Sequence, residues 1–117
     1  MKSRETTGFS TLEYHVLLAL ARAPLHGYAI KDAVAAESVG ALTPRAGSLY
    51  RVVARLMSSG LVAEEEAPGA VGPHPGLARR YYGLTRSGRG ALAAETTRMK
   101  RAAALADERL GTADGRP

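Results

Sequence analysis

The sequence of 117 residues contains no cysteine, no tryptophan and only one phenylalanine. The absence of cysteine excludes disulfides, thiolate metal sites and thiol redox sensing. Its longest apolar run, residues 16–21, is far too short to span a bilayer. Nothing at the polar and charged start of the chain resembles a signal peptide. We therefore expect a cytoplasmic protein without a membrane partner.

Hydrophobic residues make up 45% of the chain and charged residues 23%, a balance typical of a folded protein. A chain of this length forms one domain with a modest core and room for an extension. The net charge is +5, but only three of the 16 basic residues are lysines. Because an arginine and alanine excess can follow from genome composition, the positions of the charges are more informative than their total.

Helical periodicity and breaking residues divide the chain into segments. We expect a first helix from a cap at Ser10 or Thr11 to about Ala23, and a second from His26 to Gly40 that buries Tyr28, Ile30 and Val34. Thr43 as cap and Pro44 at the first position predict a third helix, which Gly60 closes.

Two strands are expected next, at residues 61–65 and 79–84, joined by a tip rich in proline and glycine. A last helix is expected from Thr85 to Leu110. The pattern predicts a mainly α fold with a small β wing, a winged helix-turn-helix. The expected parts are an N-terminal tail (1–9), the winged domain (10–85), a C-terminal dimerisation helix (86–111) and a disordered tail (112–117).

The third helix has two distinct faces at about 100° per residue. Its core face is expected to hold Ala46, Leu49, Val53, Leu56 and Met57, while Ser48, Arg51 and Arg55 lie opposite, with Arg45 at the edge. Arginine at the start of an exposed helix is suited to reading guanine in the major groove. The sequence predicts double-stranded DNA as a partner, with bases read by Arg45, Ser48 and Arg51. Phosphate and wing contacts are expected from Lys31, Tyr50, Arg55, Arg79 and Arg80.

Other interpretations of these residues stay open. An arginine-bearing helix face can simply be solvated, and basic residues on an edge strand can protect it from aggregation. Glu64, Glu65 and Glu66 either pair with Arg79 and Arg80 across the hairpin or point away from the DNA. A winged-helix module that binds protein rather than DNA is the main alternative function. No catalytic constellation and no metal-ligand spacing of the three histidines is present, so neither an enzyme nor a cofactor is expected.

The sequence resembles the PadR family of bacterial transcriptional regulators. The similarity rests on three motifs: residues 25–28 (Leu-His-Gly-Tyr); residues 47–50 (Gly-Ser-Leu-Tyr) with Leu56 and residues 60–62; and residues 80–82 with Leu84, Thr85, Gly88 and Leu92. The resemblance implies a homodimer that represses transcription from a palindromic operator and is often released by a small molecule. The single terminal helix is similar to that of the short-tailed branch of the family.

One stripe of the last helix has the spacing of a helix-packing seam. The residues expected in the dimer interface are Leu92, Met99, Ala103, Ala106 and Leu110. A hydrophobic effector is a further expected partner, in a cleft between the terminal helices and the winged domains of the dimer. The residues expected near that cleft are Phe9, Leu12, Tyr14, His15 and Val16. The alternative is that these residues only fill the core.

Overall fold

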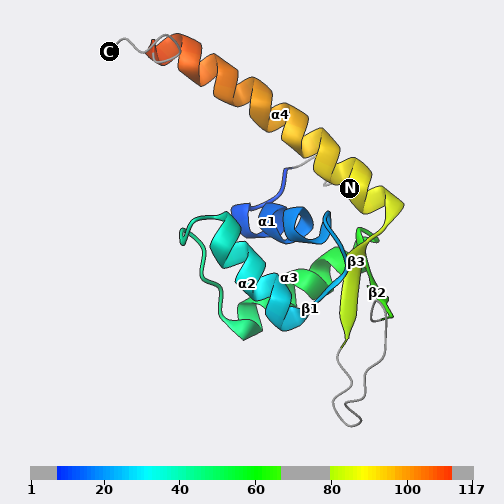
Figure 1. The fold of residues 1–117 in the computed structure, drawn as a ribbon. Coiled ribbons are helices and arrows are strands. Elements are labelled where there is room, and N and C mark those ends of the chain that lie inside the picture. The colour runs from blue at the N-terminus through cyan, green and yellow to red at the C-terminus, as the bar shows by residue number, and fades with distance from the viewer. Residues whose placement is uncertain (1–7, 67–79, 112–117) are drawn as a thin grey trace.

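The computed structural model describes residues 8–66 and 80–111 (Figure 1). The described part is a helical domain with a small antiparallel sheet and one long helix that extends from it. In chain order the elements are α1 (Thr11–Leu20), β1 (Leu25–His26), α2 (Gly27–Glu37), α3 (Ala46–Ser58), β2 (Val62–Glu65), β3 (Tyr81–Leu84) and α4 (Arg86–Leu110). The expected winged helix-turn-helix is confirmed. The tails at residues 1–7 and 112–117 lie outside the described residues.

Helix α1 begins with a capping box. The Ser10 hydroxyl accepts a hydrogen bond from the Glu13 backbone N–H at 3.1 Å, and the Glu13 carboxylate accepts one from the Ser10 N–H at 2.8 Å. This arrangement satisfies two N–H groups that a helix end would leave unpaired. The expected cap at Ser10 is therefore confirmed, although the helix ends at Leu20 rather than Ala23.

Helix α3 begins two residues later than the sequence predicted. Its cap is Arg45, which has an extended backbone and makes no side-chain capping bond, so the predicted cap at Thr43 is wrong. Pro44 precedes the cap instead of occupying the first turn. The shift leaves Ala46 exposed rather than on the core face, whereas Val52, which was not predicted there, is buried.

Helix α2 buries Ile30 and Val34, as expected, but Tyr28 is 65% exposed. The prediction for Tyr28 was wrong because a residue two positions before Ile30 lies about 200° around the helix from it. The helix ends at Glu37, and the turn that follows contains Val39 and Gly40, both with positive φ (55° and 80°).

The sheet has the order β1-β3-β2, with β3 antiparallel to both neighbours. Leu25 pairs with Tyr82, and Val62 pairs with Leu84 at the other edge. Strand β1 was not predicted because two residues are too few to show an alternating pattern. The wing is thus attached through β3 to the segment between α1 and α2.

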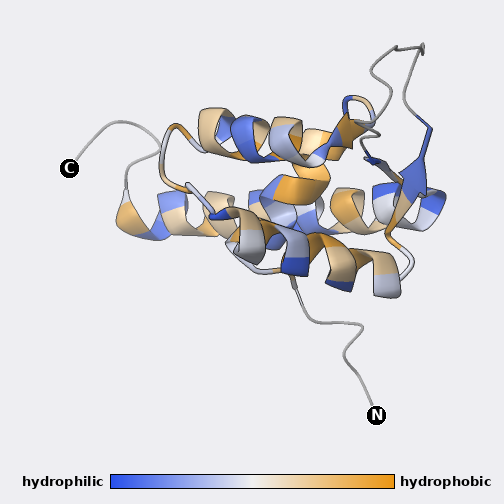
Figure 2. Ribbon diagram, turned by 90° about the horizontal axis from the view of Figure 1, so that it is seen from below, coloured by the Kyte–Doolittle hydropathy of each residue, from blue (hydrophilic) through white to orange (hydrophobic). Residues whose placement is uncertain are grey.

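The hydrophobic core lies where α1, α2, α3 and the sheet meet. Its members from the helices and sheet are Val16, Leu17, Leu20, Ile30, Val34, Leu49, Val52, Val53, Leu56, Val62 and Tyr82. Of the long α4, Leu92 packs against this core, whereas residues 97–111 are all exposed. Figure 2 shows hydrophobic and hydrophilic residues alternating along α4 to its far end. Within the described ranges, no helix is both long and apolar enough to cross a membrane.

Candidate nucleic-acid interface

Helix α3 presents arginines to solvent at and near its N-terminus. Arg45 caps the helix and Arg51 lies six residues further on; both are exposed, and Ser48 between them is half-buried. The residues described include no carboxylate in an ion pair with Arg45 or Arg51. Cationic side chains and backbone N–H groups at a helix start both attract an anionic partner.

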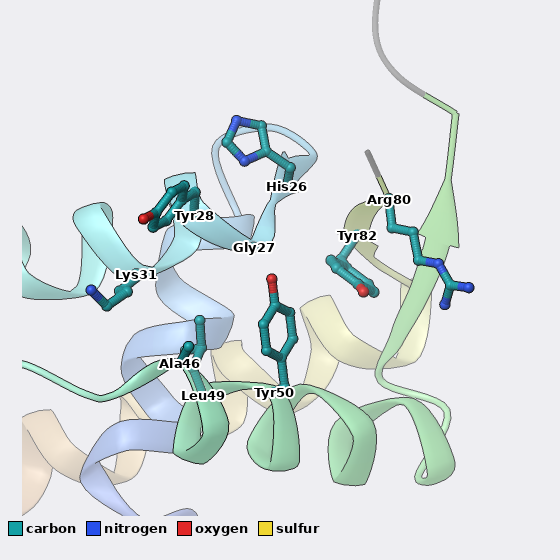
Figure 3. A pocket seen from close by; sticks show the side chains of 9 residues that line it. All are labelled: His26, Gly27, Tyr28, Lys31, Ala46, Leu49, Tyr50, Arg80 and Tyr82. Carbon is teal, nitrogen blue, oxygen red and sulfur yellow. The ribbon is translucent and has the colours of Figure 1, made fainter. Parts of the chain in front are cut away.

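A pocket of about 660 Å³ lies beside α3, between the start of α2 and the wing (Figure 3). The nine residues that line it are His26, Gly27, Tyr28, Lys31, Ala46, Leu49, Tyr50, Arg80 and Tyr82. The structure thereby brings together Lys31, Tyr50 and Arg80, three of the residues expected to contact phosphates. Lys31 and Arg80 lie on opposite sides of the Tyr50 ring, and their charged ends point away from it (Figure 3).

Sequence reasoning missed Tyr28 and His26 as parts of this surface. The Lys31 Nζ atom lies 5.8 Å from the centroid of the Tyr28 ring, within the range of a cation–π interaction. His26 caps α2 by accepting a hydrogen bond from the Ala29 N–H at 3.3 Å, and its ring packs edge-on against Tyr81. The Leu-His-Gly-Tyr motif could have identified both residues.

Gly27 gives the Tyr50 ring room to enter the pocket. A β-carbon built on residue 27 would lie 2.8 Å from Cζ and 2.9 Å from Cε1 of Tyr50. Ordinary non-bonded carbon atoms approach to about 3.5–4.0 Å. Any other residue at position 27 would therefore displace the tyrosine.

Arg55 is directed toward α1. Its Nη1 atom lies 3.0 Å from Oε2 of Glu13, and the two side chains are 59% and 14% exposed. The sequence gave no local sign of this pair, since no acidic residue lies between Thr43 and Ala63. A guanidinium has five N–H donors, so this ion pair leaves others for a phosphate.

Arg80 pairs with Glu64 across the wing, at 3.4 Å between Nε and Oε2. Of the alternatives that the sequence left open, pairing across the hairpin is therefore observed for these two residues. Both side chains are well exposed (73% and 46%), so the pair contributes little and a phosphate can compete for Arg80. Arg79 lies outside the described residues.

The residues expected to form an effector cleft have separate contacts. Val16 is fully buried in the core, so it does not line an open cleft in this structure. Phe9 and Leu12 are partly buried against the same core. The Tyr14 hydroxyl lies 2.6 Å from Thr96 Oγ1, and His15 Nδ1 lies 3.0 Å from the Thr11 carbonyl oxygen.

The residues expected in a dimer interface divide into two groups. Leu92 packs against the core of its own chain. Met99 and Leu110 are 45% and 68% exposed, and Ala103 and Ala106 are also exposed. Four of the five residues in the stripe are thus accessible to another molecule in the single chain.

Among the residues with described positions, no three histidine or acidic side chains come together to hold a metal ion. The fold and the basic surface define a winged-helix regulator of transcription. Residues 16–94 match the transcriptional regulator PadR-like family, and the chain belongs to this family. Its members are regulators of transcription rather than enzymes.

Solved structures share the fold. A PadR-like transcription factor from Bacteroides fragilis is 27% identical, with a TM-score of 0.67 over 83% of this chain and 87% of that one. A PadR family regulator from Eggerthella lenta is 28% identical, with a TM-score of 0.62 over 83% and 81%. PadR of Bacillus subtilis, solved in complex with operator DNA, is 23% identical, with a TM-score of 0.58 over 72% and 46%.

A 37.1 kDa protein of unassigned function in transposon TN4556 of Streptomyces fradiae is 42% identical over 86 residues. The match covers 74% of this chain, which spans only about a fifth (22%) of that relative.

Proposed function

We propose that the protein is a repressor that binds a palindromic DNA operator as a homodimer in the cytoplasm. The observation that carries the proposal is the surface formed by the exposed arginines of α3 and the adjoining pocket, which contains Lys31 and Arg80. The Bacillus subtilis relative with this fold was solved bound to operator DNA, which supports the same class of partner for this chain.

In this proposal the two groups of basic residues have different roles. Arg45, Ser48 and Arg51 reach base edges in the major groove, because α3 enters it with its N-terminal part. The DNA backbone passes over the pocket, where Lys31 and Arg80 meet phosphates and the tyrosines lie between them. Arg55 contributes a further phosphate contact, and so does Arg79, as the sequence predicts.

The second copy of the chain covers the exposed half of α4. Met99, Ala103, Ala106 and Leu110 recur at intervals of four, three and four residues, which suits packing against an identical helix. The small alanine side chains allow close approach of the two helices. Two-fold symmetry of such a dimer would match a palindromic operator, with half-sites about 34–36 Å apart.

A hydrophobic small molecule could release the operator by binding where α4 meets α1 in the dimer. Phe9, Leu12, Tyr14 and His15 are partly exposed there. The ligand would act by preferring a dimer whose α3 helices have the wrong spacing for DNA. Screening hydrophobic compounds against the protein–operator complex tests this part, and release of DNA by at least one compound is expected.

Selection of bound sequences from a random duplex pool tests the central proposal. We expect enrichment of a palindrome with half-site centres about 10 base pairs apart. Enrichment of a single half-site would contradict the dimer, while no enrichment at all would favour a winged-helix module that binds protein.

A further inference from the structure

Helix α1 lies between the two elements that the proposed function uses. Figure 1 shows α4 along one side of α1, with α2 and α3 on the other side. Two consecutive residues of α1, Glu13 and Tyr14, make polar contacts with these two different elements. Glu13 contacts α3, and Tyr14 contacts α4.

Glu13 is held at both oxygens of its carboxylate. Oε1 accepts the Ser10 N–H in the capping box at 2.8 Å, and Oε2 accepts a hydrogen bond from Arg55 at 3.0 Å. The carboxylate is only 14% exposed. The Arg55 side chain is 59% exposed, but the charge on both groups makes the hydrogen bond stronger than one between neutral groups. Glu13 therefore restrains α3 relative to the start of α1.

Tyr14 is held at its hydroxyl. That oxygen lies 2.6 Å from Oγ1 of Thr96, and the pair is partly buried. Thr96 immediately precedes the part of α4, residues 97–111, that is exposed in the single chain. The Tyr14 ring also packs edge-on against His15, at 5.8 Å between centroids. Tyr14 therefore restrains α4 at the point where it leaves the domain.

The body of α1 is a stiff connection between these two contacts. Val16, Leu17 and Leu20 are at most 1% exposed and pack in the core. Close-packed interiors transmit displacement rather than absorb it. A shift of α4 near Thr96 would therefore displace α1, and with it the contact between Glu13 and Arg55 on α3.

We propose that Glu13 and Tyr14 are positioning residues that set the half-site spacing the dimer accepts. The inference rests on the proposed function, since it takes α4 as the dimer helix and α3 as the DNA-reading helix. With both contacts present, the distance between the two α3 helices is fixed. Without them each winged domain tilts on its α4, and operators with altered spacing are tolerated.

The test uses operators whose half-sites are moved apart or together by one or two base pairs. The variant combines Glu13→Gln and Tyr14→Phe. Glutamine keeps the capping bond to Ser10 but loses the charge that holds Arg55, and phenylalanine keeps the ring but loses the hydroxyl.

We expect the unmodified protein to bind each operator of altered spacing about tenfold or more weakly than the selected operator. The variant should bind the same altered operators about threefold or less more weakly. Glu37→Gln, which removes an exposed charge at the end of α2, is the matched control and should behave as the unmodified protein.

A second measurement does not depend on DNA. Because the chain has no cysteine, Ala54→Cys on α3 and Ala94→Cys on α4 introduce unique sites for spin labels at exposed positions. Labelled chains diluted with unlabelled ones report the distance between α3 and α4 within one chain. The variant should show a broader distance distribution than the unmodified protein.

The outcomes separate the two proposals. Full spacing discrimination by the variant, or an unchanged distance distribution, overturns the role of Glu13 and Tyr14. Failure of the unmodified protein to dimerise or to select an operator overturns the proposed function instead. The spin-label measurement then still decides whether Glu13 and Tyr14 hold α3 and α4 at a fixed distance from each other.

Discussion

The Tyr50 ring of α3 lies against the backbone of Gly27 at the start of α2. The fit leaves no room for a β-carbon, which would be 2.8 Å from Cζ of the tyrosine. Tyr50 is still 48% exposed, so its ring forms part of the pocket surface rather than of the core. One glycine thus determines the position of a side chain on the proposed DNA-binding face.

We predict that Gly27→Ala weakens DNA binding while leaving the fold stable. The half-exposed ring can swing into solvent, so the free energy of unfolding should change by about 1 kcal/mol or less. Urea denaturation and DNA titration measure the two effects. Gly90→Ala is the control, because a β-carbon there meets nothing within 4 Å and the residue lies on α4 rather than on the proposed DNA-binding face. Equal DNA affinity for Gly27→Ala and the unmodified protein would refute the importance of this fit.

Gly88 and Gly90 both lie in the first turns of α4. Replacing each by alanine should change the free energy of unfolding in opposite directions. A β-carbon at Gly88 would overlap the Leu61 carbonyl oxygen, which already accepts a 3.0 Å hydrogen bond from the Thr85 N–H. Because a backbone group must move, Gly88→Ala should destabilise by about 2–3 kcal/mol. Gly90 has open space around it, so Gly90→Ala should stabilise the monomeric fold by about 0.5–1 kcal/mol. Thermal denaturation of both variants provides the comparison.

Arg51 and Arg55 should differ in their effect on sequence preference. Arg51→Ala removes a proposed base contact, so it should cost about 1–3 kcal/mol on the operator and relax its sequence preference. Arg55→Ala should weaken binding to all DNA sequences alike. It should also reduce the slope of log affinity against log salt concentration by about one. Titrations of operator and random DNA at several salt concentrations separate the two. Equal losses on both DNAs for Arg51→Ala would show that it does not read bases.

Val39 is the one non-glycine residue with a positive φ among those described, and it is 90% exposed. A left-handed conformation costs an ordinary L-residue about 1–2 kcal/mol, more for a branched side chain. Val39→Gly should therefore raise the free energy of unfolding by about 1 kcal/mol. The adjacent Gly40→Ala, at a φ of 80°, should lower it by a similar amount. An unfolding midpoint that falls for Val39→Gly would contradict this account of the turn.

Truncation after Arg98 should produce a folded monomer. The cut removes residues 99–117, of which the described residues 99–111 are all exposed, and it keeps Leu92 and the Tyr14–Thr96 bond. Sedimentation should show a dimer for the full chain at micromolar concentration and a monomer for the truncated one. A monomeric full chain, or a truncated chain that still dimerises, would count against α4 as the dimer helix.

Periodicity and capping signals were sufficient to predict α1, α4 and most of the core. They worked because the helix ends are held by local bonds: the Ser10 hydroxyl accepts from the Glu13 N–H, the Gly60 N–H donates to the Met57 carbonyl, and the Thr85 hydroxyl accepts from the Gly88 N–H. Local signals failed to predict the start of α3. The Thr43–Pro44 pair has the features of a helix start, yet the chain stays extended through Arg45.

The candidate site was only partly accessible to sequence reasoning. Exposed arginines on α3 follow from a helical wheel, but the Glu13–Arg55 pair joins residues 42 positions apart and has no local signature. Lys31, Tyr50 and Arg80 were predicted to contact phosphates, but only the fold shows that they line one pocket. The two-residue strand β1, which places α2 beside the wing, lies below the length at which alternation is visible.

The central position of β3 has a consequence for how the chain folds during synthesis. Leu25 in β1 pairs with Tyr82 in β3, which is synthesised 57 residues later. This edge of the sheet therefore cannot form until β3 has been made. Pairings so distant in sequence form slowly because the intervening chain must first be ordered. On the ribosome, the three helices made first can collapse early, but their exposed edge at β1 stays open until β3 emerges. The winged domain is therefore completed at nearly the same time as α4, the helix proposed to bring two copies together.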